Sequence, residues 1–106
     1  MYFVKEPIAT FIYSLDFDNT YDKLVSKLKE MGLPIEKEDR KKGKILVYCA
    51  VELIDWVFWR ADSKELLFEI RQIEENRTKV GIFGIPGIRR KGKLYDLDEL
   101  LSQLKV

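Results

Sequence analysis

Residues 44–51 read KILVYCAV and residues 53–61 read LIDWVFWRA, and these two stretches decide the fold class. A strand with one face in water alternates apolar and polar side chains. Both stretches instead carry large apolar residues at odd and even positions alike. In the second stretch, Trp56 points to one face of the strand and Trp59 to the other. We therefore expect two strands whose second face also needs a cover.

The chain has 106 residues, which is enough for one ordinary domain that spans residues 1–106. Its hydrophobic content of 46% is typical of a globular protein. Nineteen basic and eighteen acidic residues leave a net charge of +1, so the whole-molecule charge predicts no polyanionic partner. The many lysines and glutamates, with no histidine, suggest a thermophilic source.

The sequence also predicts where the protein resides. The first 30 residues contain no charged segment followed by an apolar one, as a secretory leader would require. No apolar run approaches the 18 or so residues of a membrane span. We therefore expect a cytoplasmic protein that does not enter a membrane.

Several chemistries are excluded by residue type. Without histidine, a Ser-His-Asp triad, a Cys-His pair and a histidine-ligated metal are all impossible. The single cysteine, Cys49, permits no intrachain disulfide and no thiolate zinc site, and its apolar surroundings predict a small buried thiol. We expect no catalytic residue, metal or cofactor. An enzyme, the third possibility, would have to use carboxylates such as Asp16, Glu52 or Asp55.

The remaining elements are read from periodicity and capping signals. Residues 8–15 alternate as a strand, and a helix is expected to start at the N-cap Asn19 and to end at Gly32, before Pro34. A second helix follows Asp96, with leucines at helical spacing. Other expected segments are a charged connection at 36–43, a turn at 61–64, a strand at 65–73, a turn at 74–77, a strand at 78–85 and an irregular basic loop at 86–93.

The expected order is strand, helix, four strands, helix. Short turns between consecutive strands imply antiparallel pairing. We therefore predict an α+β domain with a five-stranded, mainly antiparallel sheet and both helices on one face. This element order resembles one half of the TATA-binding-protein-like fold and, more loosely, the helix-grip domains that hold apolar ligands.

Two helices cover only one face of such a sheet, and the other face stays apolar whichever way the central strands point. A soluble monomer rarely leaves a patch of this size bare. We therefore expect a non-enzymatic binding or assembly module, most simply a homodimer. A different protein, an apolar small molecule or the N-terminal segment are the other possible covers. The residues expected at this face are Tyr48, Val47, Trp56, Val57 and Trp59.

Two locally basic segments, 37–44 and 89–93, support an alternative function in nucleic-acid binding. For each segment alone a solvated loop is the favoured explanation, and the functional interpretation gains only if both segments converge at one edge of the sheet. Tyr48 and the tryptophans would then be available for stacking on bases. The residues expected to contact phosphates are Lys41, Lys42, Lys44, Arg89, Arg90, Lys91 and Lys93.

Overall fold

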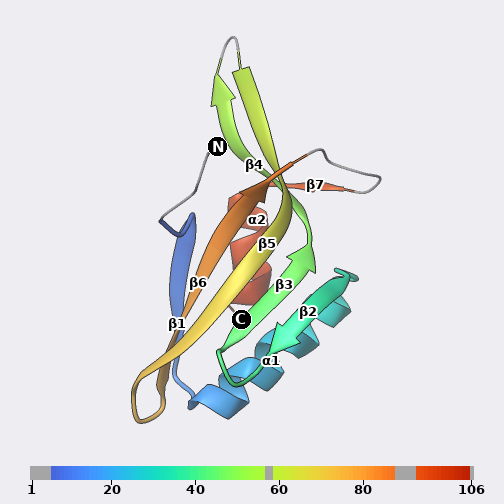
Figure 1. Cartoon of the computed structure of the whole chain (residues 1–106). Coiled ribbons are helices and arrows are strands. Elements are labelled where there is room, and N and C mark those ends of the chain that lie inside the picture. The colour runs from blue at the N-terminus through green and yellow to red at the C-terminus, as the bar shows by residue number, and fades with distance from the viewer. Residues whose placement is uncertain (1–5, 57–58, 88–92, 106) are drawn as a thin grey trace.

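A computed structural model describes residues 6–56, 59–87 and 93–105, without the side chains of residues 53–62. Its elements follow the order of the chain (Figure 1). They are β1 (Ala9–Tyr13), α1 (Phe17–Glu30), β2 (Ile35–Asp39), β3 (Lys44–Tyr48), β4 (Ala50–Trp56), β5 (Trp59–Glu74), β6 (Arg77–Pro86), β7 (Leu94–Tyr95) and α2 (Leu97–Leu104).

Five strands lie side by side in the order β1-β6-β5-β3-β2, and every neighbouring pair is antiparallel. Both helices lie on the same face of this sheet, as Figure 1 shows. The predicted α+β class is thereby confirmed. The resemblance to one half of the TATA-binding-protein-like fold stays a prediction.

The predicted single strand at 53–61 is wrong, because the chain reverses direction within it. Trp56 at the end of β4 lies opposite Trp59 at the start of β5, so the two strands form a hairpin. No glycine, proline or asparagine marks this reversal in the sequence, which explains why turn chemistry did not reveal it. The predicted turn at 61–64 lies inside β5, whose 16 residues pair with β4 and then with β3.

A buried serine joins the β3 and β4 segments to β5. The Ser63 hydroxyl donates to the carbonyl of Cys49 and accepts from the backbone N–H of Val51, both at 2.8 Å. Ser63 is fully buried, so its side chain satisfies two backbone groups that water cannot reach. The chain therefore bends between β3 and β4 without leaving these two backbone groups unpaired.

Two short strands were not predicted. β2 forms within the expected charged connection and pairs with β3 at the edge of the sheet, where all its residues after Ile35 are exposed. Charged side chains on an edge strand are a common protection against further strand pairing, so the polar sequence concealed a strand. β7 pairs with the start of β4 in the parallel direction.

The helices begin and end close to their predicted positions. α1 starts earlier than expected, because Asp16 rather than Asn19 is its N-cap and accepts from the backbone N–H of Asn19 at 2.9 Å. Gly32 adopts the predicted left-handed conformation, with φ of +73°, after the helix ends. α2 follows the predicted cap Asp96. In the part of the chain that the structure describes, neither helix is long and apolar enough to span a membrane.

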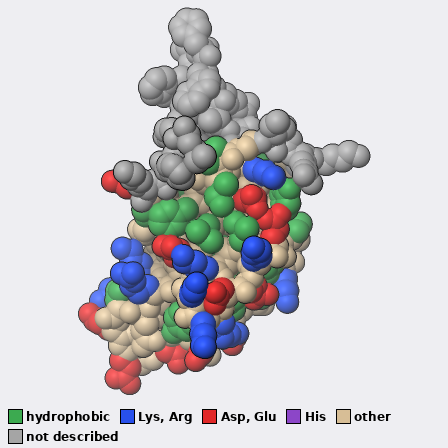
Figure 2. Space-filling model, viewed as in Figure 1, with side chains coloured by type: hydrophobic (Ala, Val, Ile, Leu, Met, Phe, Trp, Pro, Cys, Tyr) green, Lys and Arg blue, Asp and Glu red, His purple; other side chains and the backbone are tan. Residues whose placement is uncertain are grey.

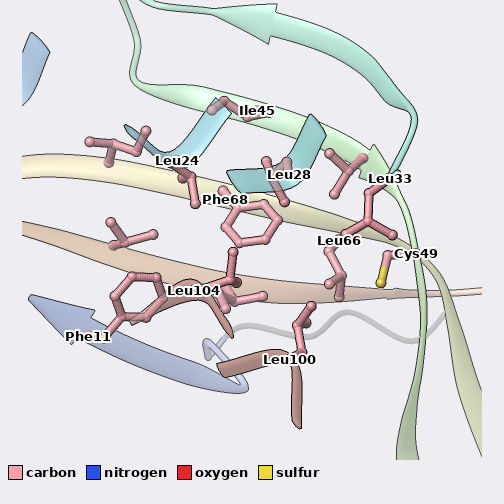
Figure 3. Close-up of a cluster of buried hydrophobic side chains, with 14 of the residues drawn as sticks. Phe11, Leu24, Leu28, Leu33, Ile45, Cys49, Leu66, Phe68, Leu100 and Leu104 are labelled. Atoms are coloured by element: carbon pink, nitrogen blue, oxygen red, sulfur yellow. The ribbon is translucent and has the colours of Figure 1, made fainter. Parts of the chain in front are cut away.

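The core lies between the sheet and the two helices (Figure 3). Phe68 of β5 is fully buried among leucines of α1 and α2, with Phe11 of β1 at one side. The hydroxyl of Tyr13 donates to the carbonyl of Leu104, which ties β1 to the end of α2. The helix stripes and the alternating strand residues predicted from sequence thus meet in one cluster.

Candidate binding face

The helix-free face of the sheet is defined by alternation along β5. Leu66, Phe68 and Ile70 point to the helices and are 0–4% exposed. The residues between them, Leu67 and Glu69, lie on the opposite face and are half-buried. Figure 2 views the molecule from this side and shows a cluster of apolar side chains bordered by charged ones. The helix-free face is therefore the part of the sheet that offers side chains to a partner.

Five apolar residues form one patch on this face, here called the apolar row. Leu67 lies directly between Leu46 of β3 and Phe83 of β6 in the register of the sheet. One row further along, Tyr48 and Ile85 flank Glu65 in the same way. All five are half-buried, and none belongs to the core cluster or to the side chains packed against it. The apolar row thus spans the three adjacent strands β3, β5 and β6 and consists of Leu46, Tyr48, Leu67, Phe83 and Ile85.

The interface residues expected from sequence are distributed unequally. Tyr48 belongs to the apolar row, but Val47 points the other way and is fully buried in the core. The prediction that Val47 belongs to the interface is therefore wrong, because Val47 cannot contact a partner on the helix-free face. The backbones of Trp56 and Trp59 lie opposite each other in the hairpin, and their side chains lie outside the described part, as does all of Val57.

Next to the apolar row lies an open groove of about 510 Å³, here called the cationic groove. Its charged lining consists of Glu69 and four cations, Lys42, Lys44, Arg71 and Lys79. Its other lining includes Thr10, Gly81 and Phe83. Lys44 lies 3.7 Å from Glu69, so the one carboxylate of the groove already faces one of the four cations.

The basic residues expected from sequence also have different positions. Lys42 and Lys44 line the groove, and Lys41 is exposed in the same turn. Lys93 forms an ion pair with Glu99 of α2, whose carboxylate raises the pKa of Lys93. Residues 89–91, namely Arg89, Arg90 and Lys91, lie outside the described residues. The contact of these three residues with nucleic acid stays a prediction.

Two of the four groove cations, Arg71 and Lys79, were not among the residues predicted from the sequence. The alternation of residues 65–73 already put Arg71 on the face opposite Phe68, which was an available signal. The register that places Arg71 beside Lys79 was not, because it depends on how β5 and β6 pair. Only the assembled sheet brings these two side chains next to Lys44.

Of the three carboxylates named for a catalytic role, two have side chains in the described part of the chain. Asp16 caps α1, Glu52 is half-buried in β4, and the side chain of Asp55 lies outside the described part. Among the residues that the structure describes, no group of three or more acidic or cysteine side chains is placed to hold a metal ion. The described geometry therefore gives no reason to assign a reaction.

Cys49 is buried, as predicted, and is 4% exposed. Burial raises the pKa of its thiol to about 12, because the thiolate is poorly solvated there. We expect native Cys49 to react with a thiol reagent at least about 100-fold more slowly than the unfolded chain, since labelling requires opening of the fold. Following the labelling by mass spectrometry, with and without denaturant, measures this ratio. Equal rates in both conditions would contradict the burial.

A scan against protein-family models gives no match for this chain, and a search of curated proteins gives none either. The apolar row and the cationic groove are therefore the features from which a function is inferred.

Proposed function

We propose that this chain is a non-enzymatic assembly module that pairs with a second copy of itself through the apolar row. The observation that carries the proposal is the position of the row. Leu46, Leu67 and Phe83 lie on three adjacent strands, on the face that neither helix covers. A partner that covers this row buries apolar surface that the fold itself leaves partly in water.

The driving force is the hydrophobic effect, at roughly 25 cal/mol for each Å² of apolar surface removed from water. Contiguous apolar patches on soluble proteins commonly mark interaction sites. Figure 2 shows that apolar side chains gather on this face and that charged side chains lie beside and below them. An interface usually combines an apolar centre with a polar rim.

A second copy is favoured because the row is close to self-complementary. Leu67 in the central strand has an apolar neighbour on each side, Leu46 and Phe83, and Glu65 is flanked likewise by Tyr48 and Ile85. A two-fold axis that runs beside Leu67 therefore brings Leu46, Leu67 and Phe83 of one copy onto the same residues of the other. Two-fold homodimers are also the commonest soluble oligomers. An apolar small molecule is less suited, because the groove beside the row is lined by four cations.

Replacing Leu67 by lysine should convert the dimer into a monomer. The lysine places a charge at the centre of the proposed interface, where pairing would have to remove it from water. In the monomer its ammonium group can extend into solvent, so the fold should persist. Sedimentation at micromolar concentration should give twice the 12.5 kDa chain mass for the parent protein and a single chain mass for Leu67→Lys.

Ile12→Lys is the matched control. Ile12 lies on β1, outside the apolar row, and is 46% exposed. The same chemical change there should leave the dimer intact. A parent protein that sediments as a monomer up to high micromolar concentration would overturn the proposal. So would a Leu67→Lys variant that remains dimeric with native circular dichroism.

A further inference from the structure

We propose that the cationic groove binds the phosphate backbone of a single-stranded nucleic acid. This ligand is separate from the second copy proposed above, since the groove occupies the rows of the sheet next to the apolar row. Among the described residues, Phe83 alone belongs to both. The inference rests on the charge of the groove, its span across the sheet and the way the fold holds its cations in place.

The charge in the groove far exceeds what the whole chain predicts. The 106 residues carry a net charge of +1, yet the described lining of the groove combines four cations with one carboxylate. Among the described residues, Lys42, Arg71 and Lys79 take part in none of the ion pairs, whereas Lys44 faces Glu69. Three of the four groove cations can therefore neutralise phosphates without first breaking an ion pair with a described residue.

Two basic residues outside the groove are engaged elsewhere in the fold. Arg40 forms ion pairs with Asp18 and Asp22 and stacks over the ring of Tyr21. Lys93 is paired with Glu99 and lies over the ring of Tyr95, 4.7 Å from its centre. Arg40 and Lys93 are thus already paired within the fold, whereas Lys42, Arg71 and Lys79 of the groove are in none of the ion pairs among the described residues.

The cations are spread out in a way that suits a chain of phosphates. Lys44, Arg71 and Lys79 lie on the neighbouring strands β3, β5 and β6, so they span two strand spacings, or about 10 Å. This is wider than one phosphate group, and the groove is open rather than closed around a small ligand. A flexible single strand can follow such a path across a sheet. A duplex is less suited, because its bases are already stacked on each other.

The groove also offers an aromatic ring. Phe83 is half-buried and lines the groove beside the cations, but it also belongs to the apolar row, so its ring is open to a base only in the single chain. Bases of a single strand stack on such rings, with little preference for sequence. Open sheet faces that combine aromatic and basic side chains are a common way to bind single-stranded RNA.

The fold fixes the groove from one side through a close backbone contact. The carbonyl of Gly43 accepts a hydrogen bond from the backbone N–H of Ile70 at 2.7 Å, which anchors the β2–β3 turn on β5. Lys42 and Lys44 flank this anchored glycine. Their backbones are therefore held beside Arg71 before any ligand arrives, which lowers the ordering cost of binding.

The test is a fluorescence anisotropy titration with a labelled single strand of about 12 nucleotides. We expect micromolar or tighter binding near 0.15 M salt. Three or four neutralised phosphates predict a slope of log affinity against log salt of about −2 to −3 for a single strand. The double variant Arg71→Ala/Lys79→Ala should weaken binding at least about tenfold and make the slope shallower by about 1.4.

The matched control is Lys27→Ala/Lys29→Ala, which makes the same charge change in the last turn of α1. It should leave affinity and slope unchanged. Equal loss in both double variants would show that only net charge matters and would overturn the site. Absence of binding near 0.15 M salt would overturn it too, as would pyrophosphate binding as tightly as the oligonucleotide.

Failure of this inference is distinguishable from failure of the proposed dimer. The dimer is read from sedimentation without nucleic acid, and Arg71→Ala/Lys79→Ala should keep the mass of the parent protein. Nucleic-acid binding is read from anisotropy in the same protein, whether it sediments as one chain or two.

Discussion

Replacing Gly43 by alanine is expected to destabilise the fold by about 2–5 kcal/mol. Gly43 has φ of +65°, a left-handed conformation that costs an alanine roughly 1–2 kcal/mol. An added Cβ would also lie 2.3 Å from the backbone carbonyl oxygen of Ile70. A backbone atom in the central strand cannot move aside cheaply, so either the turn or β5 must shift, at roughly 1–3 kcal/mol more.

Gly32 provides the matched control for this substitution. It also has a positive φ, of +73°, but a Cβ there meets nothing within 4 Å. Gly32→Ala should therefore cost only the conformational part, about 1–2 kcal/mol. Urea unfolding followed by circular dichroism measures both variants. Equal destabilisation of the two would show that the contact with Ile70 is not the cause.

The Gly43→Ala variant also bears on the cationic groove. If the turn shifts, Lys42 and Lys44 move relative to Arg71, and oligonucleotide affinity should fall although no charge is removed. Gly32→Ala lies at the end of α1 and should leave that affinity unchanged.

Replacing Ser63 by alanine is expected to cost about 2–4 kcal/mol, although only one oxygen atom is lost. The change leaves the carbonyl of Cys49 and the backbone N–H of Val51 without the partner they share. Each unsatisfied buried backbone group costs roughly 1–3 kcal/mol, and local relaxation recovers a part of this. Ser63 is fully buried, so water cannot readily replace the hydroxyl.

Ser102→Ala is the control, because it removes a similar hydrogen bond in an exposed place. The Ser102 hydroxyl donates to the carbonyl of Glu99 at 2.7 Å within α2. Water can satisfy that carbonyl, so the change in unfolding free energy should stay within about 0.5 kcal/mol. The urea midpoints of the two variants give the comparison. A Ser63→Ala variant as stable as Ser102→Ala would contradict the role assigned to the buried hydroxyl.

The apolar character of the candidate binding face was predictable from the sequence, but most of the residues that form it were not. The sequence indicated an apolar sheet face opposite the helices, and Tyr48 lies on it. Val47 was assigned to this face and lies in the core, because the parity of β3 depends on which side the helices pack. Leu67 and Phe83 alternate with buried residues in the sequence, yet their alignment with Leu46 follows only from strand register.

The sequence by itself determined the elements whose signals are local. The end of α1 before Gly32, the leucine stripe of α2 and the alternation of β5 and β6 are set by neighbours in the chain. The α+β class follows from these elements.

Only the tertiary structure decided the features that join distant residues. The hairpin at Trp56 and Trp59 has no local turn signal, and β2 is a strand only because β3 offers it hydrogen-bond partners. The groove cations lie on β3, β5, β6 and the turn before β3, so their proximity is a property of pairing and not of spacing. Backbone hydrogen bonds between strands carry no residue-specific signature, which is why sequence periodicity could predict β1, β3, β5 from residue 65 onward and β6 but not their register.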